Sequence, residues 1–253
     1  MLLVVDVGNT HTKIGAFEGE ALRFVSRLST QQSTTDDQLA VWIDRFLALN
    51  HVSREQITGA IISAVVPAMG AMTKRAVALL LNIKALLLGP GIKTGLNICI
   101  DNPGQMGSDL VAAGVAAMAK YPLPLIVFGL GTATTVSALT ERGLMGGAIY
   151  PGVGISLNAL SNSTALLSHI NIEKPKSAIG KNTEDCMKSG VVFGTAAMLD
   201  GMAARIEAEL GEACTLVATG GHAHDIIPAC TREIVNDEHL VLEGLRMIYM
   251  KNQ

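Results

Sequence analysis

The sequence predicts an α/β protein built of two similar lobes. Two observations carry this prediction. A polar, glycine-containing hairpin occurs twice, in residues 2–17 and 125–139, and short apolar strands alternate with segments of helical hydrophobic spacing. With 253 residues, the chain is long enough for two domains that each have a core. We expect the lobes at residues 1–120 and 121–253.

The first hairpin leads from an apolar run, Leu2–Val5, into a carboxylate, Asp6, and then turns through Gly8-Asn9-Thr10. Such a turn offers backbone N–H groups to phosphate oxygens, and the acid beside it can hold a divalent cation. Taken alone, the hairpin also fits an ordinary turn whose polar residues satisfy turn geometry.

The second hairpin, Leu125–Leu139, repeats the first. When Val5–Thr10 is aligned with Phe128–Ala133, the apolar lead-in, the central glycine and the hydroxyl-rich turn coincide. Two phosphate-type hairpins half a chain apart resemble the duplicated actin-like (ribonuclease H-like) fold of the sugar kinases, whose two lobes grip a nucleotide. Each hairpin of that fold usually brings an Asp, but Gly129 stands at the second position.

Composition narrows the classes of function. The 19 Lys and Arg against 22 Asp and Glu give a net charge of −3, and no basic cluster points to a nucleic-acid partner. The apolar run before Asp6 is too short for a signal peptide or an anchor, so we expect a cytoplasmic chain. The four cysteines lack metal-ligand spacing and lie in apolar contexts, which favours buried thiols over disulfides or zinc.

A long stretch of residues 121–172 carries only two charged side chains other than His, Glu141 and Arg142. Its Thr, Ser, Gly and Pro content argues against a membrane segment and for buried strands and a helix that packs against another subunit. We therefore expect a homodimer.

The remaining elements follow from hydrophobic spacing and turn residues. In the first lobe we expect a third strand at 22–28, a helix at 37–49 capped by Thr35-Asp36, a parallel βαβ unit (strand 61–66, helix 68–81, strand 85–88) and a helix to about 120 capped by Ser108 or Asp109. In the second lobe we expect a strand at 144–149, helices at 155–167 and 184–210, and a strand at 215–219.

Gly220-Gly221 follows that last strand. Two glycines there suit an adenosine-binding turn, because a flat adenine must lie against bare backbone. A tight strand-to-helix turn is the other interpretation.

Seven motifs, spread over nearly the whole chain, resemble those of the type III pantothenate kinases. They are, in order, Asp6-Val-Gly-Asn-Thr10, Asn102-Pro103 with Gly107-Ser-Asp109, Gly131-Thr-Ala-Thr-Thr135, Gly146-Gly-Ala-Ile-Tyr-Pro-Gly152, Thr164-Ala165, Gly180-Lys-Asn-Thr183 and Thr219-Gly-Gly221. The resemblance implies a dimeric, actin-like, Mg²⁺-requiring enzyme. Such an enzyme transfers the γ-phosphoryl group of ATP to the primary hydroxyl of pantothenate, the first step of coenzyme A synthesis.

The resemblance also implies residue roles. Asp109 is the implied general base, which must lie within hydrogen-bond reach of the hydroxyl it deprotonates; simple helix capping is the other interpretation. The implied ATP-binding residues are Asp6, Val7, Gly8, Asn9, Thr10, His11, Thr12, Lys13, Thr132, Gly220 and Gly221, with Asp6 near Mg²⁺. The implied pantothenate-binding residues are Asn9, Ile100, Gly107, Ser108, Asp109, Leu110 and Thr183, the last across the dimer interface.

Three positions depart from the family. Leu110 stands where the family has an Arg that pairs with the pantothenate carboxylate, Ile100 where it has a Tyr, and Gly129 where it has an Asp that binds a monovalent cation (K⁺). These departures leave two alternatives open. One is a catalytically impaired paralogue that binds nucleotide or a protein partner, and the other is a kinase for another small alcohol.

Overall fold

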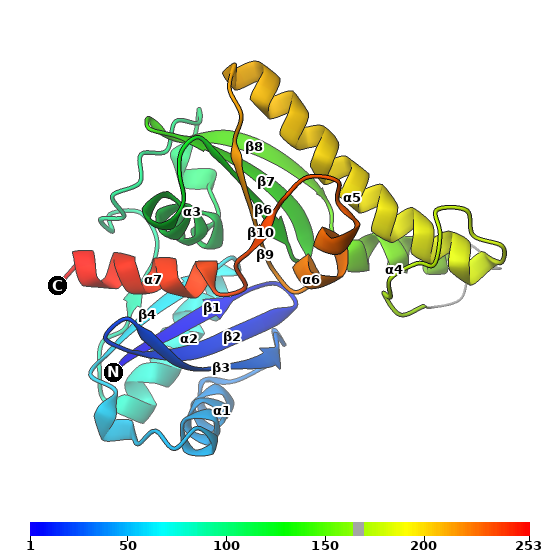
Figure 1. Ribbon diagram of the computed structural model, residues 1–253. Helices are drawn as coiled ribbons and strands as arrows, with labels where there is room; N and C mark the ends of the chain where they lie inside the picture. The colour runs from blue at the N-terminus through cyan, green and yellow to red at the C-terminus, as the bar shows by residue number, and fades with distance from the viewer. Residues whose placement is uncertain (164–169) are drawn as a thin grey trace. The chain divides into compact units, whose positions relative to one another are not determined.

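The computed structural model describes residues 1–163 and 170–253 (Figure 1). Its contacts divide the chain into two compact units. The first unit comprises Met1–Leu96, Asn102–Ala116 and Leu240–Gln253, and the second comprises Asn97–Asp101 and Ala117–His239. Each unit carries one five-stranded sheet. The predicted α/β class with two lobes is confirmed.

The sheet of the first unit has the strand order β3-β2-β1-β4-β5. The first three strands form antiparallel pairs, and β4 and β5 add parallel strands on the other side of β1. The predicted βαβ unit is therefore present. The elements are β1 (Leu2–Val7), β2 (His11–Glu18), β3 (Ala21–Ser29), α1 (Asp36–Leu49), η1 (Arg54–Gln56), β4 (Gly59–Ala64), α2 (Pro67–Leu81), β5 (Leu86–Leu87) and η2 (Pro103–Gln105).

The second unit repeats this sheet in the order β10-β9-β6-β7-β8. Its strands are β6 (Leu125–Leu130), β7 (Ala133–Thr140), β8 (Gly143–Pro151), β9 (Thr215–Thr219) and β10 (Val235–Asn236). The first three strands contain 6, 8 and 9 residues in both units. The register even shifts at the same place, between Ala16 and Phe17 and between Ala138 and Leu139. The internal duplication predicted from the two hairpins thus extends over three strands.

The helices of the second unit are α4 (Val153–Ser163), α5 (Thr183–Leu210), α6 (Ala223–Ile226) and the short η3 (Ile227–Ala229). The long helix α5 matches the expected bounds, and it ends where Gly211 adopts a left-handed φ of 80°. Residues 164–167 of the helix expected at 155–167 lie outside the described residues, as does the predicted motif Thr164-Ala165.

The two predicted helix caps of the first lobe have different outcomes. Thr35 caps α1 in a capping box with Gln38, as expected. By contrast, Ser108 and Asp109 lie inside the first turn of α3 (Ser108–Lys120), where the Val111 N–H donates to the Gly107 carbonyl at 3.1 Å. The capping prediction for α3 is wrong because the Ser108 hydroxyl bonds to β4 instead.

Helix α7 (Leu240–Lys251) belongs to the first unit, although the expected lobe boundary put residues 121–253 together. Its buried Leu242, Leu245 and Ile248 pack into one cluster with residues of β1 and β2, among them Val4 and Phe17. Figure 1 shows α7, in red, beside the blue strands of this unit. The apolar face of α7 covers the side of the first sheet that α1 and α2 leave open.

The cysteine prediction holds only in part. The cysteines of the described residues are free, as expected, but Cys186 is exposed and Cys99, Cys214 and Cys230 are half-buried. The apolar neighbours in the sequence do not enclose these thiols. Within the described residues, no helix combines the length and the apolar character that a membrane crossing requires.

The packing of α7 gives a first prediction. A Cβ atom added at Gly244 would lie 1.8 Å from the Ala112 carbonyl oxygen, so Gly244→Ala forces α3 and α7 apart. We expect it to destabilise the protein by about 1–3 kcal/mol. As a control, Gly201→Ala in α5 meets nothing within 4 Å and should stabilise by about 0.5–1 kcal/mol. Chemical denaturation of both variants measures the difference, and equal stabilities would contradict the packing.

Candidate active site

The first group of predicted site residues surrounds the end of β1. In the sheet register Asp6 lies opposite Lys13 of β2 on one side and opposite Ser63 of β4 on the other. Asp6 interrupts an otherwise apolar strand, whose neighbours Val5 and Val7 are buried in the core. Asp6 thus places a carboxylate at a strand position where an apolar side chain is normally found.

Burial governs the electrostatics of Asp6. The pKa of Asp6 is raised to about 7, chiefly by burial and then by the negative charge of Asp109, while Lys13 and the side chain of Ser63 act in the opposite direction. The Oδ1 atom of Asp6 is shut off from solvent and has no hydrogen-bond partner among the described residues. A buried acceptor of this kind is costly unless a cation or a donor compensates it.

The second carboxylate, Asp109, lies in the first turn of α3. Its Oδ1 atom accepts a hydrogen bond from the Leu110 N–H at 2.9 Å, and burial raises the pKa of the carboxyl group. Gly107 makes room for it, because a Cβ atom there would lie 2.6 Å from Asp109 Oδ1. The structure therefore brings together Asp6, Lys13, Gly107 and Asp109, which the sequence predicted from two separate motifs.

The turn between β1 and β2 carries the remaining predicted phosphate residues. The Gly8 N–H donates to the His11 carbonyl at 3.0 Å, and Asn9 and Thr10 are exposed at the tip. Thr12 differs from them, because it is buried and its hydroxyl is hydrogen-bonded to that of Thr30 at 2.9 Å. The turn thus has exposed residues at its tip, and the start of β2 is held in place by the bond between Thr12 and Thr30. This arrangement suits an anion-binding loop.

The corresponding turn of the second unit, between β6 and β7, has Thr132 exposed at its tip. Gly220 packs against the end of β6 with a left-handed φ of 109°, and a Cβ atom there would lie 2.5 Å from the Leu130 carbonyl oxygen. The His222 N–H donates to the same carbonyl at 3.2 Å. Hydrogen bonding and close packing thus bring Gly220-Gly221 beside the turn that holds Thr132.

Gly129 takes the place in β6 that Asp6 takes in β1. It is paired with Thr135, and a Cβ atom at Gly129 would lie 2.5 Å from Thr135 Oγ1. The second hairpin therefore presents a hydroxyl where the first presents a carboxylate.

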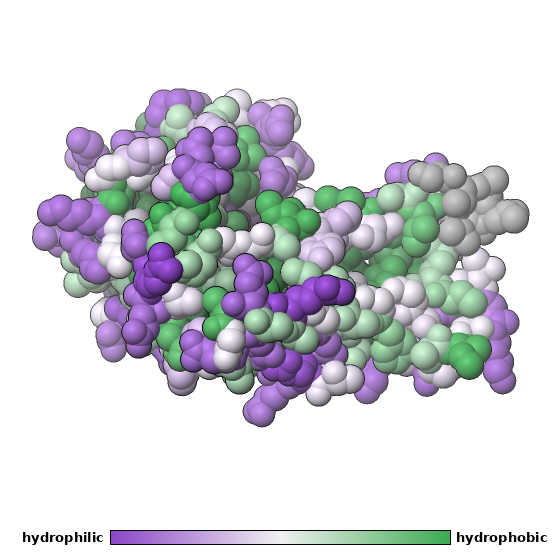
Figure 2. Space-filling model, turned by 90° about the horizontal axis from the view of Figure 1, so that it is seen from above, coloured by the Kyte–Doolittle hydropathy of each residue, from purple (hydrophilic) through white to green (hydrophobic). Residues whose placement is uncertain are grey.

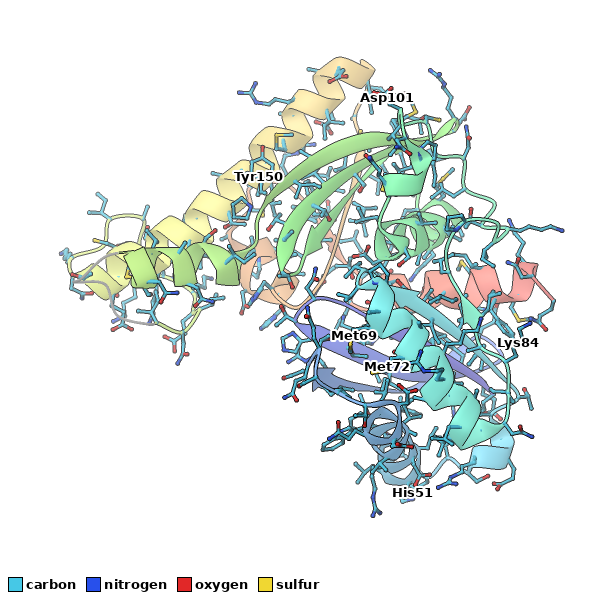
Figure 3. The ribbon with its side chains drawn as sticks, turned by 180° about the vertical axis from the view of Figure 1, so that it is seen from behind. His51, Met69, Met72, Lys84, Asp101 and Tyr150 are labelled. Carbon is cyan, nitrogen blue, oxygen red and sulfur yellow. The ribbon has the colours of Figure 1, made fainter. Side chains whose placement is uncertain are left out.

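Two further predicted residues of the second unit lie far from this turn in the sequence. Ile100 faces β8, with its Cγ2 atom 3.8 Å from the Cβ position of Gly146. Thr183 is exposed at the start of α5, directly after the helix cap Asn182. Figure 3 labels Tyr150 of β8, which packs against the core of the second unit.

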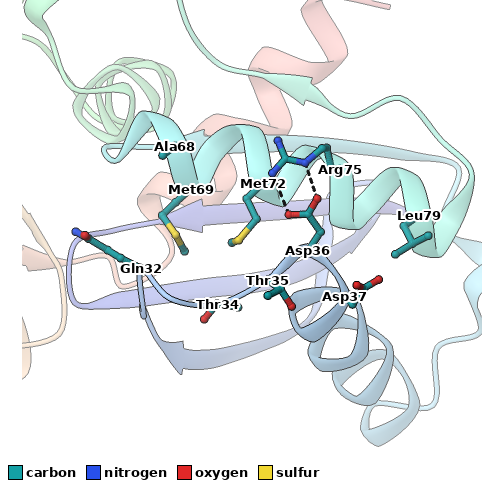
Figure 4. A pocket seen from close by; sticks show the side chains of 10 residues that line it. All are labelled: Gln32, Thr34, Thr35, Asp36, Asp37, Ala68, Met69, Met72, Arg75 and Leu79. Atoms are coloured by element: carbon teal, nitrogen blue, oxygen red, sulfur yellow. Dashed lines mark hydrogen bonds and ion pairs between the residues drawn. The ribbon is translucent and has the colours of Figure 1, made fainter.

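A surface pocket of about 640 Å³ lies elsewhere in the first unit, between the start of α1 and α2. Figure 4 shows Met69 and Met72 on α2 and the ion pair that joins Arg75 to Asp36. This pocket contains none of the predicted site residues. The candidate site is therefore the group around Asp6 and Asp109, whose polar neighbour Ser63 the sequence analysis missed.

Comparison with known proteins decides the family. The sequence profile described as type III pantothenate kinase matches residues 2–205. The chain belongs to this family. A type III pantothenate kinase from Brevibacillus brevis is 41% identical over 254 residues, and one from an Exiguobacterium species is 40% identical, each covering 100% of both chains. One from Anaeromyxobacter dehalogenans is 38% identical over 255 residues.

Solved structures confirm the fold class as actin-like. Component A of (R)-2-hydroxyglutaryl-CoA dehydratase from Acidaminococcus fermentans superimposes with a TM-score of 0.58 at 15% identity, covering 98% of this chain and 96% of that chain. The ethanolamine utilization protein EutJ from Carboxydothermus hydrogenoformans reaches 0.55 at 13% identity, with 97% and 88% covered. At these identities the likeness concerns the fold alone.

The raised pKa of Asp6 gives a second prediction. In the folded protein the Asp6 carboxyl group keeps its proton up to about pH 7, whereas in the unfolded chain it loses the proton near pH 3.8. Ionisation of Asp6 therefore destabilises the fold increasingly as the pH rises between these values. Without Mg²⁺ and nucleotide, Asp6→Asn should therefore stabilise the protein at pH 8 by up to about 4 kcal/mol, and the gain should shrink toward pH 4.

Denaturation curves at the two pH values provide the measurement. Asp36→Asn serves as a control of opposite sign, because the ion pair with Arg75 lowers the pKa of Asp36. That variant should be slightly less stable than the parent at pH 8. An Asp6→Asn protein that is also less stable than the parent at pH 8 would contradict the raised pKa of Asp6.

Proposed function

We propose that this chain phosphorylates pantothenate to 4′-phosphopantothenate at the expense of ATP, the reaction of its family, with Asp109 as general base and Asp6 as the residue that holds the metal. Relatives named type III pantothenate kinase match it over its full length, which supports a kinase, a transferase with an alcohol as acceptor. The observation that supports the residue roles is the pair of half-buried carboxylates with raised pKa values in the first unit.

Asp109 has the properties of a base for a primary alcohol. Burial raises the pKa of Asp109 above its usual value, which makes its carboxylate a stronger base. One of its oxygens is fixed by the Leu110 N–H, and the carboxylate has a second oxygen for the substrate hydroxyl. In phosphoryl transfer the protein acts mainly by positioning and by electrostatics, so a fixed base is what the reaction requires.

Asp6 has the properties of a Mg²⁺ ligand. Its unpartnered Oδ1 atom and its repulsion by Asp109 would both be relieved by a divalent cation. Among the described residues no cluster of three or more His, Cys, Asp or Glu side chains could hold a metal ion. This fits Mg²⁺, which usually takes one or two carboxylates together with substrate phosphates. When bound, Mg²⁺ neutralises charge on the transferred phosphoryl group.

The proposed roles of the remaining residues follow from the family resemblance, and the position of each residue within its own unit supports them. In the first unit, the exposed turn at Gly8-Asn9-Thr10 and Lys13 suit the phosphates of ATP. In the second unit, Thr132 suits a phosphate, and the bare backbone of Gly220-Gly221 suits adenosine. Asn9 and Gly107 are the proposed pantothenate contacts of the first unit.

We also propose a cytoplasmic homodimer in which Thr183 reaches the partner's pantothenate. The exposed apolar side chains of β8 and α4 in the second unit support an interface, among them Ile149, which is 76% exposed, and Ile155, which is 45% exposed. Figure 2 shows hydrophobic side chains at the surface of this part of the unit.

Because Gly129 offers no carboxylate to a monovalent cation, we propose activity that does not depend on K⁺. Sedimentation and assays with and without K⁺ test these points.

Replacing the proposed base should separate binding from chemistry. Asp109→Asn keeps the shape of the side chain but removes the proton acceptor, so we expect the rate of pantothenate phosphorylation to fall about 10²- to 10⁴-fold. The affinity for Mg·ATP, measured by calorimetry, should change little. An Asn variant that turns over at the rate of the parent would reduce Asp109 to a structural residue, and an inactive parent would exclude the proposed function.

Leu110 gives a further prediction about substrate recognition. A buried bidentate pair between Arg and a carboxylate contributes roughly 1.5–3 kcal/mol, or about ten- to a hundredfold in affinity. Leu110 is half-buried, next to Asp109 in α3, so Leu110→Arg should lower the KM for pantothenate by this factor with little change in kcat. Leu79→Arg, at an exposed position of α2, is the matched control. An unchanged KM would favour another small alcohol as the substrate.

A further inference from the structure

Ser63 is a buried polar residue to which neither the resemblance nor the sequence pattern assigns a role. It is fully buried near the end of β4, in register with Asp6 of β1. Its side chain lowers the pKa of Asp6, and its Oγ atom is hydrogen-bonded to Ser108 Oγ of α3 at 2.9 Å. The Ala64 N–H in turn donates to Ser108 Oγ at 3.1 Å.

The contacts hold the Ser108 hydroxyl against two consecutive residues of β4. Ser108 Oγ accepts a hydrogen bond from the Ala64 N–H, and it shares a second hydrogen bond with Ser63 Oγ, in which either hydroxyl can be the donor. The first turn of α3 is therefore fixed to the end of β4, the strand that pairs with β1 and places Ser63 opposite Asp6.

These bonds link the two carboxylates of the proposed site through β4. Ser108 directly precedes Asp109 in the first turn of α3, so a bond to Ser108 fixes where that turn begins. Asp6 lies on the paired strand β1, opposite Ser63. Burial makes the bonds stronger than they would be in water, and it makes a missing partner costly.

We propose that Ser63 is a positioning residue: through Ser108 it sets the separation between the Asp6 and Asp109 carboxylates. This inference rests on the proposed function, because the separation matters only if both groups act on one reaction. Ser63 does not touch the substrate. It acts by holding β1 and the start of α3 in one arrangement, to which catalysis is sensitive at the level of 1 Å.

The test compares Ser63→Ala with the parent, Ser63→Thr and Thr73→Val in steady-state phosphorylation of pantothenate. We expect Ser63→Ala to lower kcat about 10- to 100-fold, with the KM for ATP and pantothenate changed less than about threefold. Ser63→Thr keeps the hydroxyl and should recover most of kcat. Thr73→Val removes another fully buried hydroxyl of the first unit, which donates to the Met69 carbonyl, and should leave kcat unchanged.

A second measurement does not depend on activity. Hydrogen exchange of the α3 first turn, residues 108–111, should become faster in Ser63→Ala and in Ser108→Ala, but not in Thr73→Val. Unchanged exchange, or a kcat of Ser63→Ala equal to that of the parent, overturns the proposal. An equal loss of kcat in Thr73→Val also overturns it. If Asp109→Asn is inactive while Ser63→Ala is fully active, the role of Ser63 fails and the proposed function stands.

Discussion

Repulsion between two half-buried carboxylates is the interaction on which the candidate site depends. Burial raises the pKa of both Asp6 and Asp109, and the negative charge of Asp109 raises the pKa of Asp6 further. A fold keeps such an arrangement only if the surrounding packing over-determines it, and carboxylates with perturbed pKa values cluster at functional sites. The apolar core around β1 supplies that packing. A bound cation and a substrate hydroxyl would relieve the repulsion, so the unfavourable energy of the free protein favours ligand binding.

The two units share one strand plan but differ in their chemistry. Where the first hairpin has Asp6 opposite Lys13, the second has Gly129 opposite Thr135. The second unit instead brings bare glycine backbone beside its turn, at Gly220 and at Gly152, where a Cβ atom would lie 2.1 Å from the Thr132 carbonyl oxygen. In the duplicated fold, the first unit therefore carries charged side chains at its hairpin, whereas in the second unit glycine backbone packs closely against the hairpin. This division fits the proposed roles, with the metal ligand and the base in the first unit and the adenosine contact in the second.

Much of the fold could be predicted because strands and hairpins leave a local pattern. The alternation after Asp6 and after Gly129 predicted both hairpins and their duplication, and the sequence motifs predicted Asp109 as a site residue. The position of α7 could not be predicted, because an apolar helical face does not specify which sheet it covers. Ser63 was missed for a similar reason: a serine near the end of an apolar strand is ordinary until the register pairs it with Asp6. The cap expected at Ser108 was wrong because the hydroxyl found a long-range partner in β4.

A double-mutant cycle on stability tests the repulsion most directly. The free energy of unfolding would be measured at pH 8, without Mg²⁺ or nucleotide, for the parent, Asp6→Asn, Asp109→Asn and the double variant. Because each single substitution already removes the mutual repulsion, the gain in the double variant should be smaller than the sum of the two single gains. A double variant whose gain equals that sum would show that the carboxylates do not interact, and would contradict a shared site in the first unit.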